Sequence, residues 1–247
     1  MYNPFSLVGK TILVTGASSG IGKATAIECS RLGAQVILTG RNEERLNETL
    51  LTLEGYGHHL QVCDLYNTEA IASFVDGLPE IQGLVSNAGI SMLTPVNFIK
   101  EQELQQIVQV NTIAPIILLQ RLLKKKKLRK GSSVVFTSSL AGIGFSSTGN
   151  GMYSASKGAI SAFVKAAAID LGPKQIRVNA VCPGMVNTKL IETPMIQEQM
   201  AWDVKNYPLG RYGDPRDVAL AIIYLLSDGA TWVTGTNLIV DGGLTTK

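Results

Sequence analysis

One short stretch of the chain holds residues that could carry out acid/base chemistry. Tyr153 and Lys157 lie four residues apart in an alanine-rich run that continues to about Leu171, so on a helix they share one face. An ammonium beside a phenol stabilises the phenolate, and it can lower the pKa of a tyrosine from its ordinary value near ~10 towards neutrality. Such a phenol can exchange protons with a substrate oxygen. An isolated pair at this spacing could equally be a solvated helix face, so the surrounding elements must decide.

Strand-like and helix-like patterns alternate along the chain. Helical spacing runs from Ile21 to Leu32 and resumes after Asn42, a predicted helix cap. Short apolar or β-branched runs predict strands at 10–15, 35–39, 59–63, 82–86, 132–137, 175–181 and 237–240. This alternation predicts an α/β fold, a doubly wound parallel sheet of about seven strands with helices on both faces. No long linker or change of composition interrupts it, so residues 1–247 are expected to form a single domain.

The composition excludes several classes of protein. A chain that is 45% hydrophobic and 17% charged is expected to be compact rather than disordered. The net charge of +3 is too small to indicate a nucleic-acid partner. Residues 1–10 lack the features of a signal peptide, and the longest apolar run, 113–119, is too short to cross a bilayer. We therefore expect a cytoplasmic protein with neither a membrane nor a nucleic acid as partner.

The cysteines and histidines indicate neither disulfides nor a metal site. Cys29, Cys63 and Cys182 are far apart in the sequence and lie in or beside apolar segments, which predicts buried thiols in a reducing compartment. His58 and His59 are adjacent and have no cysteine or carboxylate partner at the spacing of metal ligands. No metal is expected.

A glycine-rich turn follows the first predicted strand and directly precedes a predicted helix. It reads Thr15-Gly16-Ala17-Ser18-Ser19-Gly20-Ile21-Gly22. Glycines let the backbone approach a pyrophosphate closely, and the helix N-terminus offers free amides and the positive end of the helix dipole. Such a turn is a weak indication alone, because any tight strand-to-helix loop can use glycine, and its spacing is G-x-x-x-G-x-G rather than G-x-G-x-x-G.

Two further motifs follow this turn in order: Asn87-Ala88-Gly89 closes the fourth predicted strand, and Tyr153 and Lys157 form Y-x-x-x-K. In these three motifs the chain resembles the short-chain dehydrogenase/reductase (SDR) family, and it is similar to members like the 3-oxoacyl-[acyl-carrier-protein] reductases. The resemblance covers essentially the whole chain. It implies a Rossmann fold, a nicotinamide cofactor, hydride transfer to or from a carbonyl or alcohol carbon, and a homo-oligomer, either a tetramer or a dimer.

The resemblance also implies roles for individual residues. Tyr153 would donate the proton, Ser139 would hydrogen-bond the same substrate oxygen, Lys157 would lower the tyrosine pKa and bind the ribose, and Asn111 would hold a water linked to the lysine. Ser139 is preferred because Leu140-Ala141-Gly142 completes the family's S-x-x-G, with Ser138 as the alternative. The implied cofactor-binding residues are Gly16, Ser18, Ser19, Gly20, Ile21, Gly22, Arg41, Asp64, Leu65, Asn87, Ala88, Gly89, Tyr153, Lys157, Pro183, Gly184, Val186 and Thr188.

The choice between the two nicotinamide cofactors depends on the end of the second strand. An Asp there would accept hydrogen bonds from the adenosine ribose and repel a 2′-phosphate. This chain has Gly40 and then Arg41, and a guanidinium pairs well with phosphate. NADP(H) is therefore predicted over NAD(H), unless Arg41 is merely a surface residue near a helix start. Asp64 matches the family's adenine-contacting Asp, or it is a turn residue before the helix at Asn67.

Two segments bear on the substrate. Residues 189–212 correspond to the family's substrate-binding region and carry Met195, Met200, Trp202 and Tyr207, which suggests an apolar pocket. The basic cluster, 124–127 with Arg129 and Lys130, is explained by cations at a helix C-terminus before Gly131. Alternatively it docks an acidic acyl carrier protein, although Ile90-Ser91-Met92-Leu93 departs from the I-T-R-D typical of those reductases.

Two functions follow as expectations. The first is an NADP(H)-dependent oxidoreductase acting on a small-molecule carbonyl or secondary alcohol, with a 3-oxoacyl thioester as one candidate. The alternative is a catalytically inactive, dinucleotide-sensing regulatory protein of the same fold. Sensing proteins of this kind typically lose the Tyr or the Lys, whereas this chain has both.

Overall fold

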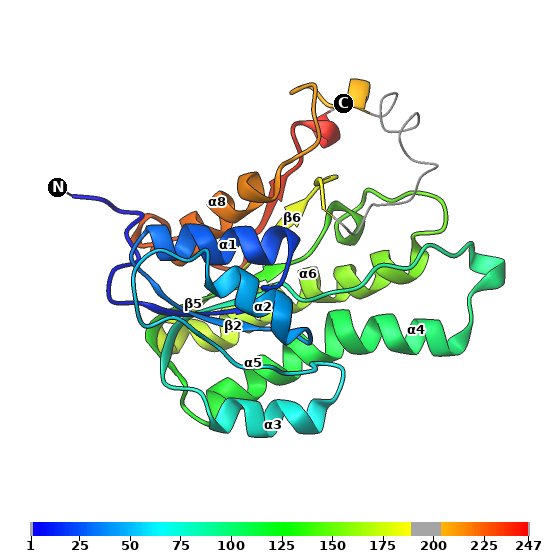
Figure 1. The fold of residues 1–247 in the computed structure, drawn as a ribbon. Helices are drawn as coiled ribbons and strands as arrows, with labels where there is room; N and C mark the ends of the chain where they lie inside the picture. Colours follow the sequence, from blue (N-terminus) through cyan, green and yellow to red (C-terminus); the bar gives the residue numbers. More distant parts are fainter. Residues whose placement is uncertain (1, 189–203, 247) are drawn as a thin grey trace.

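The computed structural model describes residues 2–188 and 204–246. Its centre is one parallel sheet of seven strands in the order β3-β2-β1-β4-β5-β6-β7. The strands are β1 (Thr11–Thr15), β2 (Gln35–Thr39), β3 (His59–Leu60), β4 (Ile81–Ser86), β5 (Leu128–Thr137), β6 (Arg177–Pro183) and β7 (Asn237–Val240). The predicted single-domain Rossmann fold is thus confirmed (Figure 1).

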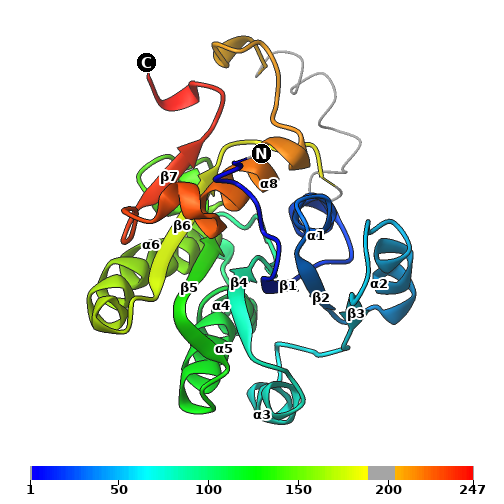
Figure 2. The same ribbon diagram turned by 90° about the vertical axis from the view of Figure 1, so that its left-hand side faces the viewer.

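Helices cover both faces of this sheet (Figure 2). The helices are α1 (Gly20–Arg31), α2 (Glu43–Leu50), α3 (Thr68–Asp76), α4 (Glu101–Val108), α5 (Ala114–Lys124), α6 (Gly151–Leu171) and α8 (Pro215–Leu226). Buried residues of α1, α2 and α8 pack with Ile12, Val14 and other strand residues in one core cluster. Those of α3, α5 and α6 pack with Leu13 and Leu84 in a second cluster. Alternate residues of a strand point to opposite faces, so adjacent residues such as Ile12 and Leu13 enter different clusters.

The order of the strands places the glycine-rich turn and Asn87 at one edge of the sheet. The chain winds outward from β1 through β2 to β3 and then returns to β4 on the other side of β1. In sheets of this kind the crevice at the reversal point, outside the carboxyl ends of the strands, is where ligands bind. The glycine-rich turn follows β1 and Asn87 follows β4, so both lie at this crevice.

The basic cluster is placed differently from the prediction. Of its residues only Lys124 lies in a helix, because α5 ends there. Lys126 then turns the chain with φ 55, and β5 begins at Leu128. Arg129, Lys130 and Gly131 therefore belong to a strand, which pairs with β4 through Leu128 and Ile81. The prediction of 132–137 was too short because this end of β5 carries exposed polar residues, which lack the apolar pattern of a buried strand.

A continuous helical segment, Glu101–Lys124, joins α4 to α5 through a π-helical stretch, Gln109–Ile113. By length and hydropathy alone this segment could cross a membrane. Its Leu118, Leu119 and Leu122 are buried in the core cluster that also contains residues of α3 and α6. Packing in this core explains these three apolar side chains.

Candidate active site

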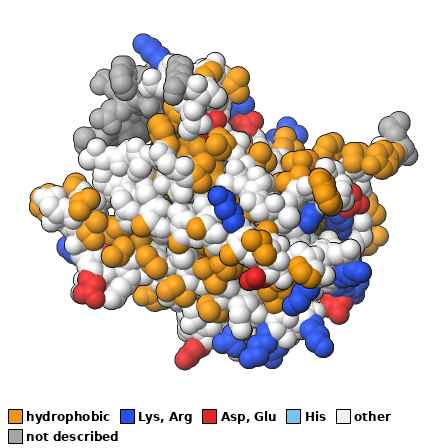
Figure 3. Space-filling model, turned by 180° about the vertical axis from the view of Figure 1, so that it is seen from behind, with side chains coloured by type: hydrophobic (Ala, Val, Ile, Leu, Met, Phe, Trp, Pro, Cys, Tyr) orange, Lys and Arg blue, Asp and Glu red, His pale blue; other side chains and the backbone are white. Residues whose placement is uncertain are grey.

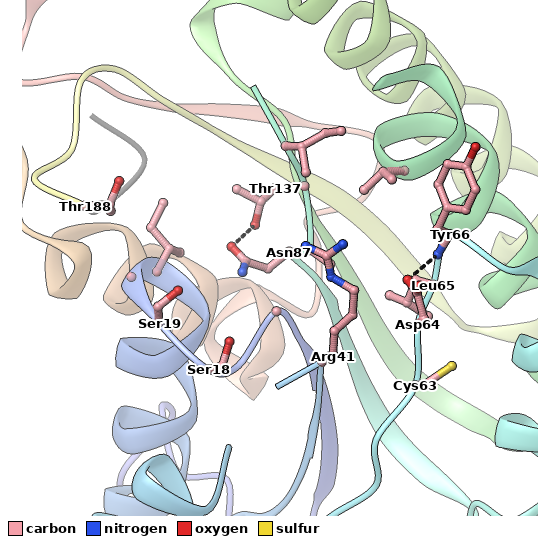
Figure 4. A pocket seen from close by; sticks show the side chains of 18 of the residues that line it. Ser18, Ser19, Arg41, Cys63, Asp64, Leu65, Tyr66, Asn87, Thr137 and Thr188 are labelled. Carbon is pink, nitrogen blue, oxygen red and sulfur yellow. Dashed lines mark hydrogen bonds between the residues drawn. The ribbon is translucent and has the colours of Figure 1, made fainter. Parts of the chain in front are cut away.

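A cavity of about 540 Å³ opens at the carboxyl edge of the sheet, within the size range of small-molecule and cofactor sites. Its lining comes from the turns after β1, β2, β3 and β4 and from α6, so segments distant in sequence meet there (Figure 4). Of the predicted site residues it includes Gly16, Ser18, Ser19, Gly20, Ile21, Arg41, Asp64, Leu65, Asn87, Ala88, Gly89, Tyr153, Lys157 and Thr188.

The glycine-rich turn leaves no room for larger side chains. Gly16 has φ +65, and a Cβ atom on it would lie 2.9 Å from Cα of Ala88. A Cβ atom on Gly22 would lie only 2.3 Å from the carbonyl oxygen of Gly16. The backbone of α1 thus approaches both its own turn and the end of β4, and it leaves a concave wall at the helix N-terminus. This wall fits the pyrophosphate of a dinucleotide.

Asn87 joins the ends of three strands. Its backbone N–H and its side-chain Nδ2 donate to Oγ1 and the carbonyl oxygen of Thr15, at 2.9 and 3.2 Å. Its Oδ1 accepts a hydrogen bond of 3.2 Å from the hydroxyl of Thr137 (Figure 4). Thr15, Asn87 and Thr137 end or follow β1, β4 and β5. Asn87 therefore fixes the floor of the cavity.

The residues after β6 approach the cavity through Thr188. A Cβ atom on Gly20 would lie 3.2 Å from Cγ2 of Thr188, so this threonine closes over the glycine-rich turn. Pro183, Gly184 and Val186 lie behind it and are not part of the cavity lining. Gly184 N donates to the carbonyl oxygen of Val240, and Val186 is buried and pairs with Gly213. These three predicted residues hold the segment that carries Thr188.

Lys157 is buried beside Tyr153. Its Nζ donates a 2.7 Å hydrogen bond to the carbonyl oxygen of Thr137 and lies 5.8 Å from the centroid of the Tyr153 ring. Burial lowers the pKa of Lys157 to about 8. A Cβ atom on Gly142 would lie 2.6 Å from the Lys157 carbonyl carbon, so the turn after Ser139 packs tightly on this part of α6.

The pKa of Tyr153 differs from the sequence-based expectation. Burial raises the pKa of its phenol above the ordinary value, and hydrogen bonding with Ser139 acts in the opposite direction. Lys157 was expected to lower this pKa, but its ammonium is directed to the Thr137 carbonyl oxygen. In this structure the serine is the group that favours the phenolate.

The two adjacent serines point to different surroundings. The hydroxyl of Ser138 is buried, donates to the carbonyl oxygen of Lys157 at 3.0 Å and shares a 2.7 Å hydrogen bond with Ser161. Ser139 instead interacts with Tyr153 and accepts a hydrogen bond from Ala141 N. Ser139 is thus the serine beside the Tyr153 phenol, and Ser138 is part of the packing beneath α6.

Asn111 is buried, although an Asn within a helix usually faces solvent. It lies in the π-helical stretch, Gln109–Ile113, with 1% of its surface exposed. Its Oδ1 accepts from Ile90 N at 2.8 Å, while its Nδ2 donates to the Ile90 carbonyl oxygen at 2.9 Å and to Ser156 Oγ at 3.0 Å. A single π-helical turn often occurs at functional sites. Here the turn directs the side-chain amide of Asn111 to Ile90, in the segment after β4.

Gly89 marks the point where Asn111 and Lys157 converge. A Cβ atom on Gly89 would lie 3.1 Å from Oδ1 of Asn111 and 3.3 Å from Nζ of Lys157. The structure thus brings together Asn111, Ser139, Tyr153 and Lys157, which come from the π-helical stretch, the turn after β5 and α6. Sequence spacing alone could relate only the last two.

Several lining residues were not predicted. They are Gly40, Arg45, Cys63, Tyr66, Ile90, Gln106, Val110 and Thr137. Thr137 could have been found, since it ends a predicted strand just before the two serines. Arg45 follows Arg41 by four residues, and its positive charge could also have indicated an anion-binding residue. The others are apolar or neutral residues for which no local pattern indicates a cavity.

The predicted substrate region, 189–212, is described only from residue 204 onward. Met195, Met200 and Trp202 therefore lie outside the described residues. Tyr207 is buried, packs edge-on against Tyr212 with ring centroids 5.2 Å apart, and accepts a hydrogen bond from Met185 N. Tyr207 thus anchors the segment after β6.

The three cysteines lie in the protein interior, as their apolar surroundings in the sequence predicted. Cys29, Cys63 and Cys182 are all buried and free. Within the ranges 2–188 and 204–246, no group of His, Cys, Asp or Glu side chains could hold a metal ion.

Known proteins resemble this chain over its full length. A family model described as enoyl-(acyl carrier protein) reductase matches residues 16–245. The 3-oxoacyl-[acyl-carrier-protein] reductase FabG of Rickettsia prowazekii is 35% identical over 238 residues, which are 96% of this chain and 98% of that protein. The glucose 1-dehydrogenase of Gluconobacter oxydans is also 35% identical, over 96% of this chain and 92% of that protein.

A solved structure shares the whole fold. A provisionally named 2-deoxy-D-gluconate 3-dehydrogenase from Agrobacterium tumefaciens, with bound NADP, superimposes with a TM-score of 0.91. It is 30% identical, and the match covers 100% of both chains. The family match, the relatives and the shared fold agree with the three motifs and with the cavity that they line. The chain therefore belongs to the short-chain dehydrogenase/reductase family of oxidoreductases.

Proposed function

We propose that this protein is an NADP(H)-dependent oxidoreductase that interconverts a small-molecule carbonyl compound and the corresponding secondary alcohol. The observation that carries the proposal is the convergence of Tyr153, Lys157 and Asn111 at the end of β4, beside a cavity that begins at the glycine-rich turn. This arrangement favours an enzyme over a dinucleotide-sensing protein, because a sensor needs the turn but has no use for a buried lysine beside a phenol.

The residues of the site divide the chemistry between them. When bound, the nicotinamide supplies or accepts the hydride. Tyr153 holds the proton for the substrate oxygen, and Ser139 shares a hydrogen bond with that phenol, so both hydroxyls can contact the same oxygen. Lys157 holds its ammonium on the Thr137 carbonyl oxygen, 5.8 Å from the Tyr153 ring centroid, where it can bind the ribose hydroxyls of the cofactor. The two hydrogen bonds between Asn111 and Ile90 fix the segment after β4, which lines the cavity next to Lys157.

The preference for NADP(H) rests on Arg41. This residue is exposed at the cavity lining, and Figure 4 shows its side chain extending between Asn87 and Asp64. A guanidinium there can pair with a 2′-phosphate. The Agrobacterium tumefaciens relative with bound NADP supports the same choice.

We propose a freely diffusing substrate rather than one carried on a protein. The basic cluster, Lys124–Lys127 with Arg129 and Lys130, lies where α5 ends and β5 begins, whereas the cavity lies at the other end of β5. At ~3.3 Å per residue, the ten residues of β5 separate these ends by roughly 30 Å. Figure 3 shows basic side chains gathered on the lower edge of the molecule.

Part of the charge of this cluster is already matched within the chain. Lys125 pairs with Asp76 at 2.7 Å, Arg129 pairs with Glu80, and Lys127 donates to the carbonyl oxygen of Leu78. These partners give the cluster a structural role at the base of the sheet. A 3-oxoacyl thioester remains a candidate substrate by similarity to the FabG relative, and a carrier-free thioester would test it.

Two further properties are proposed on similarity and composition. The three buried free thiols fit a reducing compartment such as the cytoplasm. The family resemblance suggests a homo-oligomer, either a dimer or a tetramer. Sedimentation of the purified protein at several concentrations would measure its mass in solution.

The direct test of function is a screen of dinucleotide oxidation. Purified protein would be mixed with NADPH or NADH and with keto-esters, aldoses, quinones, steroid ketones and 3-oxoacyl thioesters. We expect turnover with at least one carbonyl class and a higher kcat/KM with NADPH. Equal or better kcat/KM with NADH would refute the cofactor assignment. If the dinucleotide binds but no carbonyl or alcohol turns over, the sensing function would replace the enzymatic one.

A further inference from the structure

We propose that Arg45, together with Arg41, forms a two-guanidinium site for the 2′-phosphate of NADP(H). Both residues line the cavity, yet only Arg41 was indicated by its position after the second strand. The inference rests on the proposed NADP(H) function and adds a second residue that determines cofactor choice.

The fold holds the backbone of Arg45 close to the phosphate-binding turn. The buried hydroxyl of Thr49 hydrogen-bonds the carbonyl oxygen of Ala17, at 3.1 Å, and that of Arg45, at 3.0 Å. Ala17 belongs to the glycine-rich turn, and its own N–H donates to Thr39 at the end of β2. One buried side chain therefore ties α2 to the turn, so Arg45 does not depend on an exposed loop for its position.

A second contact ties α2 to the end of β2. A Cβ atom on Gly40 would lie 3.6 Å from Cδ2 of Leu46, so the first turn of α2 packs directly on the residue that precedes Arg41. The N–H of Arg45 is already satisfied by the cap residue Asn42, at 2.8 Å. What Arg45 offers to a ligand is accordingly its guanidinium and not its backbone amide.

The charges of the two arginines are left unmatched within the part of the chain that the structure describes. There, Arg31, Arg129, Arg211 and Arg216 are each paired with a carboxylate. Neither Arg41 nor Arg45 has such a partner among the ion pairs of the described ranges. Both arginines line the cavity, so their positive charge is available there to a bound anion.

The number of arginines also fits the charge of the ligand. Asp64 lines the same cavity and uses one carboxylate oxygen to accept a hydrogen bond from Tyr66 N. One arginine would only balance this carboxylate, whereas two leave a net positive charge. A phosphate monoester carries about −1.5 to −2 charges near neutral pH, and guanidinium groups bind its oxygens through paired hydrogen bonds.

The test compares two adenosine fragments that differ only in the 2′-phosphate. Calorimetric titration would give the Kd of 2′,5′-ADP and of 5′-AMP for the wild type, Arg45→Gln and Arg45→Lys. Lys130→Gln is the matched control, since it removes one exposed cation from the opposite edge of the sheet. We expect Arg45→Gln to raise the Kd of 2′,5′-ADP roughly tenfold and to leave that of 5′-AMP nearly unchanged. Arg45→Lys should fall between wild type and Gln.

Each other outcome identifies the step that fails. If the wild type prefers 2′,5′-ADP and Arg45→Gln keeps that preference, Arg45 is not part of the site, and the NADP(H) assignment stands on Arg41. An equal loss of both fragments would also overturn the inference, because it would show a general effect on the cavity. If the wild type itself does not distinguish the fragments, the cofactor assignment and this inference fail together.

Discussion

Nζ of Lys157 donates a 2.7 Å hydrogen bond to the carbonyl oxygen of Thr137, and this contact ties α6 to the end of β5. The lysine is almost fully buried, and its ammonium lies near the ring of Tyr153. A solvated helix face would leave the side chain mobile in water. Here the ammonium is held at the carboxyl edge of the sheet, where the cavity opens.

Removal of the Tyr153 hydroxyl should abolish proton transfer while the dinucleotide still binds. We expect Tyr153→Phe to reduce kcat by at least ~10²-fold, the usual scale for general acid catalysis. The Kd of NADPH, measured by fluorescence titration, should stay close to that of the wild type. Phe163→Tyr, which changes an aromatic residue packed on Phe136 in the core, controls for effects on packing. Turnover near the wild-type rate would remove Tyr153 from the mechanism.

The buried lysine should make stability depend on pH. Burial lowers the pKa of Lys157 from 10.5 to about 8, so between these values the unfolded chain binds more protons than the folded protein. The free energy of unfolding should therefore rise with pH across this window. At ~1.4 kcal/mol for each pH unit between the two pKa values, the full effect is roughly 3 kcal/mol.

Urea unfolding of the wild type and of Lys157→Met, at neutral pH and near the upper end of this window, measures the effect. The wild type should gain stability relative to the variant as the pH rises. Lys174→Met, which removes an exposed lysine, should behave as the wild type does. Parallel pH dependences for the wild type and Lys157→Met would show that the folded lysine keeps an ordinary pKa.

Substitution of Ser139 should lower activity, whereas substitution of the adjacent Ser138 should lower stability. Ser139 interacts with Tyr153, so Ser139→Ala should lower kcat by ~10²-fold to ~10³-fold, the range for loss of one stabilising donor. Ser138 hydrogen-bonds Lys157 and Ser161 within the core, so Ser138→Ala should cost roughly 1 kcal/mol of stability. Steady-state kinetics and urea unfolding of both variants would decide. The reverse pattern would make Ser138 the serine of the site.

Asn111 should be needed for the shape of the cavity. Asn111→Leu would leave the N–H and carbonyl oxygen of Ile90 without their partners, at a cost of roughly 2 to 4 kcal/mol. Both stability and kcat should therefore fall. Asn47→Leu on the exposed side of α2 is the matched control and should change the free energy of unfolding by less than ~0.5 kcal/mol. An Asn111 variant as stable as this control would contradict the buried network.

The glycine-rich turn should not tolerate a methyl group at Gly22. Its Cβ would lie 2.3 Å from the Gly16 carbonyl oxygen, so Gly22→Ala must displace backbone, at a cost of roughly 1 to 3 kcal/mol. Dinucleotide affinity should fall with it. A Cβ on Gly151 meets nothing within 4 Å, so Gly151→Ala should leave binding unchanged. Calorimetric titration would measure the Kd of NADPH for both variants, and equal Kd values would contradict binding of the pyrophosphate at the glycine-rich turn.

Local patterns in the sequence determined the order of the elements. The buried strands β1 and β2 are continuous short runs of apolar and β-branched residues, and the capping of α2 by Asn42 is a contact between near neighbours. Both can be inferred from a few adjacent residues. The glycine-rich turn, the Asn-Ala-Gly motif and the Tyr-x-x-x-Lys motif occur in that order, and together they were enough to indicate the family.

The tertiary structure alone decided the properties of the site. Burial of Asn111 and Lys157, the raised pKa of Tyr153 and the opposite orientations of Ser138 and Ser139 depend on segments more than a dozen residues apart. The same is true of Arg45, which reaches the cavity because Thr49 binds the turn after β1. Desolvation and hydrogen bonding act through space, and the parallel sheet brings these distant groups to one edge.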